Sequence, residues 1–284
     1  MSNIELSWGA CTDRGLKRGN NQDSFLAQQP VFLVADGMGG HEGGAEASRV
    51  TIESYRPLVD APEITSEALD KAFESAVERV YEISVHDGAA GTTLTGFFTT
   101  QRLHVWYWLV INIGDSRVYR CRDGRMEQIS IDHSAVQALV DDGMLDENQA
   151  EGHPDKNIIT RAIGAGSSGT PDYWLLTAQS GDRMLACSDG LNDELSDAEI
   201  ERVLLEEDTA ESAAQRLVHE ALVRGGRDNV TAVVVDAIYV DDDDYETTLV
   251  APLRTSWDTA EDFHREATAD LTRPRVMRAK EDRS

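Results

Sequence analysis

Apolar residues along the chain recur mostly in short runs with the composition and alternation of β-strands. Polar turn residues separate neighbouring runs, and the turns RDG (122–124) and SGD (180–182) predict two hairpins of antiparallel sheet. The predicted strands are FLAQQ (25–29), VFLVAD (31–36), TTLTGFFTT (92–100), LHVWYWLVINIG (103–114), RVYRCRDG (117–124), RMEQIS (125–130), DYWLLTA (172–178), DRMLACSD (182–189) and NVTAVVVDAI (229–238).

In two longer segments, the apolar residues recur with the period of an α-helix instead. Residues 65–84 and 209–223 each place their apolar side chains on one stripe, which predicts two amphipathic helices that cover a sheet face. Strand hairpins interrupted by such helices indicate an α+β fold of sheets flanked by helices, not a doubly wound parallel sheet. The stripes consist of Ala68, Ala72, Phe73, Ala76, Val77, Val80 and Tyr81 in the first helix and Ala210, Ala213, Ala214, Leu217, Val218, Ala221 and Leu222 in the second.

The pattern changes after Val240. Residues 241–284 are charged, weakly periodic and poor in strand-forming residues, and they begin with the acidic run DDDD. We therefore expect one folded domain over residues 1–240 and an acidic, flexible C-terminal tail over residues 241–284.

Charge, apolar content and cysteine number argue against several classes of partner and site. The formal net charge of −26 argues against nucleic-acid and anionic-membrane partners, because both require basic patches. No apolar run approaches the roughly 18 residues of a membrane helix, and the first residues lack a secretory signal pattern, so we expect a cytoplasmic protein. The cysteines Cys11, Cys121 and Cys187 are odd in number and widely spaced, which favours neither a disulfide framework nor a zinc site.

Two glycine-rich loops raise the question of nucleotide binding. In VADGMGGHEGG the dinucleotide pattern fails because Glu42 stands where the third glycine should be. The loop GAGSSG (164–169) matches G-x-G-x-x-G, but a predicted strand follows it, so the helix N-terminus that would hold a pyrophosphate is missing. With no Gly-Lys-Ser/Thr in the chain, nucleotide binding is a minority interpretation.

Four aspartates offer another interpretation, since each lies where an apolar strand meets a turn. They are Asp36, Asp115, Asp189 and Asp228. One such aspartate is most simply a turn residue. Four of them can be gathered at one end of stacked sheets, and such a carboxylate cluster requires cations to remain ionised. Oxygen ligands without histidine or cysteine favour Mg²⁺ or Mn²⁺, and the glycines after Asp36 would let backbone pass close to the metal.

Eight segments together resemble the metal-dependent protein phosphatases of the 2C type, in their compact bacterial form. They occur in family order between about residues 6 and 238: DRGLKRGNNQDS, VADGMGGHEGG, GTTLTG, NIGDSRVY, DHS, TRAIG, ACSDGLND and GGRDNVTAVVV. The resemblance implies a four-layer αββα sandwich, in which two antiparallel sheets are flanked by helices. It also implies hydrolysis of phosphoserine and phosphothreonine in proteins by a hydroxide that two Mn²⁺ or Mg²⁺ ions activate.

The resemblance assigns roles to individual residues. Asp36 would bridge the two ions, the Gly37 carbonyl would bind one of them, and Asp189 and Asp228 would bind the other. Asp23 would act through a metal-bound water, Asp115 would bind a third metal, and Arg18 would hold the substrate phosphate.

The chain departs from many relatives at two positions. Gln22 replaces a glutamate, which removes one charge near the metals. Met38 stands where larger relatives have a histidine proposed as general acid; His41 could replace it or be an ordinary loop histidine, and a metal-bound water could protonate the leaving group instead.

The resemblance also leads to predictions about substrate selection and partners. Residues 133–160 match the family's variable flap, or are an ordinary helical insertion. Two alternatives to a protein phosphatase are a pseudophosphatase that binds without turnover, which would have lost metal aspartates, and a small-molecule phosphatase. Expected partners are phosphorylated proteins, a serine/threonine kinase and a forkhead-associated domain protein. Thr247 and Thr248, after the acidic run, are candidate phosphorylation sites for such capture, or part of a solvated linker.

Overall fold

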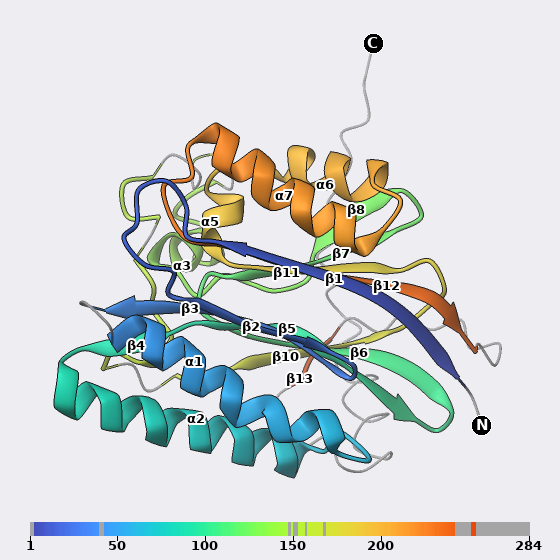
Figure 1. The fold of residues 1–284 in the computed structure, drawn as a ribbon, viewed down its shortest axis with the longest axis horizontal. Coiled ribbons are helices and arrows are strands. Elements are labelled where there is room, and N and C mark those ends of the chain that lie inside the picture. The colour runs from blue at the N-terminus through green and yellow to red at the C-terminus, as the bar shows by residue number, and fades with distance from the viewer. Residues whose placement is uncertain are drawn as a thin grey trace.

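The computed structural model describes residues 3–39, 43–146, 149, 153–156, 158–166, 169–241 and 251–253. Two antiparallel sheets stack face to face (Figure 1). In spatial order, the five-stranded sheet consists of β1 (Ile4–Asp13), β12 (Val230–Val240), β11 (Arg183–Cys187), β7 (Arg117–Arg122) and β8 (Arg125–Gln128). The eight-stranded sheet consists of β13 (Ala251–Leu253), β10 (Asp172–Thr177), β6 (Val105–Ile113), β5 (Leu94–Arg102), β3 (Val31–Gly39), β4 (Ala90–Thr92) and β9 (Ile163–Gly164), with β2 (Asp23–Gln28) paired to β3.

Helices form the two outer layers. Helices α1 (Gly43–Tyr55) and α2 (Ser66–Asp87) cover the eight-stranded sheet, and α6 (Asp197–Glu206) and α7 (Ala210–Arg224) cover the five-stranded sheet (Figure 1). The other helical segments are the 3₁₀ turn η1 (Arg56–Asp60), α3 (Ala135–Asp141) and α5 (Asp189–Asn192). The predicted α+β sandwich of four layers and both predicted helices are confirmed. In the described part of the chain, no helix is long and apolar enough to cross a membrane.

Alternating strand residues supply the core between the layers. In β3, Phe32 and Val34 point into the cluster between the two sheets, whereas Val31, Leu33 and Ala35 join the cluster under α1 and α2. A third cluster lies between the five-stranded sheet and α6 and α7. Because β3 is buried on both faces, its register is fixed, and its last residues are carried to a defined end of the sandwich.

One predicted hairpin is wrong. The SGD turn connects β10 in one sheet to β11 in the other, so it is a crossover between layers. Its Asp182 is buried and accepts hydrogen bonds from Trp108 Nε1 (2.9 Å) in one sheet and Arg122 Nε (2.5 Å) in the other. This bridge between the sheets holds the turn in place. The RDG turn does join β7 to β8, as predicted.

The end of the chain differs from expectation at one point. Residues 251–253 form β13 and pair antiparallel with β10, in the register Tyr173↔Leu253 to Leu175↔Ala251. Part of the segment expected outside the fold therefore lies on a sheet edge, where the proline at position 252 is tolerated because an edge strand need not donate every hydrogen bond.

Candidate active site

Aspartates from distant parts of the chain lie close enough to act on one another electrostatically. One of them begins α5, which lies at one end of the sandwich (Figure 1). Asp23, the first residue of β2, lies opposite Asp36 of β3 in the strand register. Asp189 is the first residue of α5, directly after β11. Asp115 lies in the turn between β6 and β7, and Asp228 lies just before β12. Asp23, Asp115, Asp189 and Asp228 lie at or beside strand ends, whereas Asp36 lies inside β3, which continues to Gly39. Pairing of β2 with β3 still brings Asp36 beside Asp23.

Burial and mutual repulsion dominate the electrostatics of this cluster. Burial raises the pKa of Asp36 well above its usual range, and the charges of Asp23 and Asp189 raise it further. Burial raises the pKa of Asp23 to about 7 and that of Asp189 to about 6. The pKa of Asp115 is also raised well above its usual range, by burial and by the charge of Asp189. The site therefore disfavours its own negative charge.

Hydroxyl groups hold the carboxylate of Asp23 and the backbone of Asp36. Asp23 Oδ2 accepts hydrogen bonds from Ser188 Oγ (2.8 Å) and Thr231 Oγ1 (2.6 Å). The backbone N–H of Asp36 donates to Thr93 Oγ1 (3.0 Å), and its carbonyl accepts from Thr92 Oγ1 (2.8 Å). One carboxyl oxygen of Asp23 and the backbone of Asp36 are thus held in place by neighbouring hydroxyl groups. All four hydroxyl residues lie within the quoted sequence motifs, but no role was predicted for them.

The remaining carboxyl oxygens fit hard cations. Within the described residues, the buried Oδ1 atoms of Asp23, Asp115 and Asp189 have no hydrogen-bond partner. In that part of the chain, no three acidic, histidine or cysteine side chains are arranged so that they could hold a metal ion as they stand. The unpartnered oxygens and the raised pKa values nevertheless indicate a cation site, because an all-oxygen cluster that disfavours its own charge requires cations to become fully ionised.

Gly37 follows Asp36 where the backbone passes very close to another segment. A Cβ at this position would lie 2.1 Å from the carbonyl oxygen of Gly44. The N–H of Gly37 donates to the carbonyl of Gln22 (3.1 Å), which also accepts a hydrogen bond from Ser48 Oγ (2.5 Å). Gln22 thus ties the start of β2 to β3 and α1 through its backbone. Any side chain at position 37 would force this junction apart.

The loop that carries Arg18 is clamped by one side chain, Asn229. Its Nδ2 donates to the carbonyls of Arg14 (2.8 Å) and Asn20 (2.9 Å), and its Oδ1 accepts from the N–H of Gln22 (2.9 Å). Arg18 is 55% exposed at the rim of the cluster, and its Nη2 donates to Asp228 Oδ2 (2.5 Å). This hydrogen bond raises the pKa of Arg18, so the guanidinium is a permanent cation at the edge of an acidic site. Asn229 was missed at the sequence level because its three partners are contacts between distant segments.

Described residues of the segment predicted as a flap, residues 133–160, contact the same part of the molecule. Lys156 Nζ lies 2.9 Å from Asp193 Oδ1, directly after α5. At its base, His133 Nδ1 accepts from the N–H of Gly114 (3.1 Å), and the other ring nitrogen of His133 contacts Asp172 Oδ2 (3.0 Å). Lys156 therefore ties this segment to the residue after α5, which carries Asp189, and His133 ties it to the turn that carries Asp115.

The structure brings together Arg18, Asp23, Asp36, Gly37, Asp115, Asp189 and Asp228, with Gln22 beside them. His41, Thr247 and Thr248 lie outside the described residues, so their predicted roles stay predictions.

Comparisons with known proteins all point to the same family. The family model described as protein phosphatase 2C matches residues 16–235. The serine/threonine protein phosphatase PstP of Mycobacterium tuberculosis is 40% identical over 244 residues, which are 84% of this chain but only 46% of PstP. The chain thus matches about half the length of that relative. The serine/threonine phosphatase stp of Listeria innocua is 34% identical over 242 residues, 79% of this chain and 93% of stp.

The fold also matches solved structures. The crystal structure of the PstP catalytic domain in complex with 2 manganese ions has a TM-score of 0.74 and 38% identity to this chain. The match covers 84% of this chain and all of that one. Sequence motifs, layer order and the acidic cluster thus agree with these comparisons: the chain belongs to the protein phosphatase 2C family.

Proposed function

We propose that the protein is a metal-dependent serine/threonine protein phosphatase that uses two Mn²⁺ or Mg²⁺ ions per active site, with room for a third. The observation that carries this proposal is the buried acidic cluster of Asp23, Asp36, Asp115 and Asp189, in which the Oδ1 atoms of Asp23, Asp115 and Asp189 have no hydrogen-bond partner. The manganese-bound PstP catalytic domain supports the choice of metals.

In this proposal each residue of the site has one task. Asp36, Asp189, Asp228 and the Gly37 carbonyl hold the two principal cations, and Asp115 holds the third. Bound divalent cations would supply a water nucleophile that is active near neutral pH and would offset the negative charge of the reacting phosphate. Asp23, whose Oδ2 is anchored by Ser188 and Thr231, presents its Oδ1 to the same space and orients water there. Arg18 binds the phosphate with those N–H groups that Asp228 leaves unused.

The exposed position of Arg18 favours a phosphate carried on a protein surface over a small metabolite enclosed in a pocket. We further infer that residues 1–240 carry catalysis, that residues 133–160 act as a substrate-selecting flap, and that the protein works in the cytoplasm opposite a serine/threonine kinase. Phosphorylation of Thr247 or Thr248 in the acidic tail, with capture by a forkhead-associated domain protein, remains part of this proposal. The family resemblance supports the flap and the opposing kinase, and the acidic run before Thr247 and Thr248 supports the phosphorylation sites.

A substrate panel tests the proposed function. With Mn²⁺ or Mg²⁺ present, phosphothreonine and phosphoserine peptides should release phosphate, and EDTA should stop the release. Phosphorylated sugars and nucleotides should be hydrolysed at least tenfold less efficiently, judged by kcat/KM. Faster turnover of a small metabolite would favour the small-molecule alternative, and tight phosphopeptide binding without turnover would favour a pseudophosphatase.

Arg18→Ala should chiefly raise KM for a phosphothreonine peptide. Loss of a charge-assisted hydrogen bond costs about 1.5–3 kcal/mol, which corresponds to a rise of about 10- to 100-fold while kcat changes little. Arg14→Ala is the matched control, because Arg14 lies on the same loop and its side chain donates to Gly19 at 3.3 Å, outside the acidic cluster. Equal KM values for the two variants would show that Arg18 does not bind the phosphate.

A further inference from the structure

The outward face of α2 carries more apolar surface than the core requires. The sequence pattern predicts that Phe73, Val77 and Tyr81 cover the sheet together with the alanines. In the structure only Phe73 packs partly against the core, whereas Val77 is 39% exposed, Tyr81 67% and Val85 63%. These four residues are spaced four apart and form one continuous stripe along the helix. Among the described residues, nothing covers Tyr81 or Val85.

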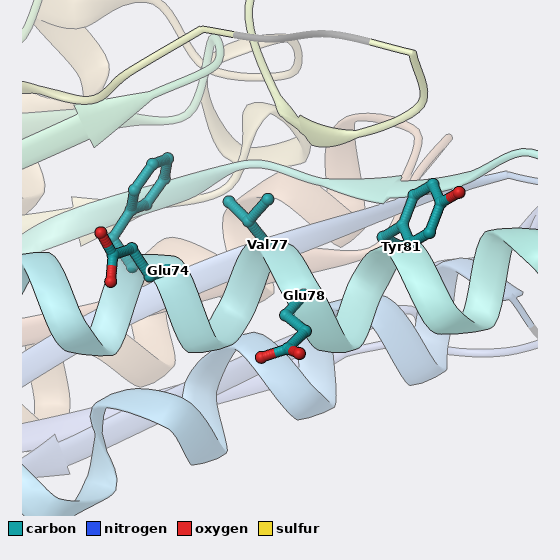
Figure 2. A pocket seen from close by; sticks show the side chains of 5 residues that line it. Glu74, Val77, Glu78 and Tyr81 are labelled. Atoms are coloured by element: carbon teal, nitrogen blue, oxygen red, sulfur yellow. The ribbon is translucent and has the colours of Figure 1, made fainter.

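An acidic row runs beside this stripe. Glu74 and Glu78 follow Phe73 and Val77 directly on α2 (Figure 2). Phe73, Glu74, Val77, Glu78 and Tyr81 line a shallow hollow of about 430 Å³. No ion pair joins Glu74 or Glu78 to another described residue, whereas the basic residues of α2 are already paired, Lys71 with Glu67 and Arg79 with Glu53. The surface thus combines exposed apolar groups with uncompensated negative charge.

One segment of the same chain has the complementary chemistry. Residues 271–280, LTRPRVMRAK, contain four basic and no acidic side chains, with Leu271, Val276 and Met277 between them. In a chain with 52 acidic and 26 basic residues, such a segment is attracted to any free acidic surface. An apolar stripe beside that surface can bury its aliphatic side chains.

The connection is long enough to allow this contact. Strand β13 ends at Leu253 on an edge of the sheet that α1 and α2 cover, and 17 residues separate it from Leu271. A fully extended chain of that length spans about 55–60 Å, whereas α2, at about 1.5 Å per residue, is about 33 Å long. A tethered segment within reach also has a millimolar effective concentration, which favours it over a second copy or a free partner.

We propose that residues 271–280 dock on the outer face of α2. Their basic side chains pair with Glu74 and Glu78, and their aliphatic side chains cover Val77, Tyr81 and Val85. This intramolecular contact does not depend on the proposed phosphatase activity.

Photo-crosslinking in the full chain tests the proposal. With p-benzoylphenylalanine in place of Tyr81, irradiation of dilute protein should join this position to residues 271–280 within one chain, as mapped by mass spectrometry. Reversing the charges in Arg273→Glu, Arg275→Glu, Arg278→Glu and Lys280→Glu together should reduce the adduct at least fivefold, as should 1 M salt, which screens charges beyond about 3 Å. Val223 is the control position, since it is 73% exposed on α7 in the opposite outer layer and should give no such adduct.

Three outcomes would overturn the proposal. An adduct at Tyr81 that maps outside residues 271–280, or that survives the charge reversal, would show that another segment covers the stripe. An adduct found only between two chains would assign the surface to a second copy. Replacement of the adduct by lipid cross-links when phosphatidylserine vesicles are added would assign it to a membrane.

Discussion

Asp36→Asn should reduce kcat/KM for a phosphothreonine peptide by about a thousandfold or more, because cation-based charge stabilisation contributes several kcal/mol to such reactions. Asp36 lies at the centre of the cluster, and the charges of Asp23, Asp189 and Asp115 all act on its carboxyl group. Asparagine preserves the shape but removes the charge that the cations require. The same variant should lose most of the rise in Tm that Mn²⁺ produces in the unaltered protein.

A second readout separates this effect from damage to the fold. Since burial and neighbouring charges raise the pKa of Asp36, its ionised form destabilises the cation-free protein, and Asp36→Asn should raise Tm in EDTA. Asp123→Asn is the control, because Asp123 is an exposed turn residue between β7 and β8 and should affect neither turnover nor the Mn²⁺ response. Undiminished turnover by Asp36→Asn would remove Asp36 from the metal site.

Without cations, the stability of the protein should fall as pH rises. The pKa of Asp23 is about 7 and that of Asp189 about 6 in the folded protein, well above the value of about 3.9 for an unfolded aspartate. Between these values the folded state binds more protons than the unfolded state. The stabilisation is therefore fully present below about pH 4 and is lost as pH rises through 6 and 7.

Urea denaturation in EDTA at pH 5 and pH 8 measures this effect. Relative to Asp23→Asn, the unaltered protein should lose about 2–3 kcal/mol of unfolding free energy between the two pH values. Saturating Mn²⁺ should reverse the trend, since cations bind the ionised carboxylates that high pH supplies. Identical pH profiles for the two proteins in EDTA would mean that Asp23 is not held in a charge-disfavouring site.

The individual strands and helices could be predicted where the local pattern of apolar residues determines them. A continuous apolar run that includes Phe32 and Leu33 identifies β3, because a strand buried between two layers must be apolar on both faces. Turn composition does not reveal which sheet the next strand joins, so the crossover at Asp182, fixed by Trp108 and Arg122, could not be foreseen. Helical periodicity likewise marked Val77 and Tyr81 as apolar but could not show that the sheet leaves them uncovered.

The candidate site, like the fold, could be predicted from the sequence only in part. Asp36 and Asp189 could be predicted because an acidic residue at the end of an apolar strand is visible in one segment of sequence. The partners that hold the cluster could not, because Ser188 and Thr231 reach Asp23 only through the order of strands in the folded sheets. Asn229 clamps a loop more than two hundred residues away, and no local pattern carries that information.

The most direct test of the central claim is to titrate the cation-free protein with Mn²⁺ while following bound metal by calorimetry and hydrolysis of a phosphothreonine peptide in parallel. We expect two tight ions per chain, hydrolysis that appears only as the second site fills, and no change in these two sites in Asp115→Asn, where only weaker binding should be lost. Hydrolysis at full rate before any Mn²⁺ is bound, or saturation at one ion per chain, would contradict a two-metal phosphatase.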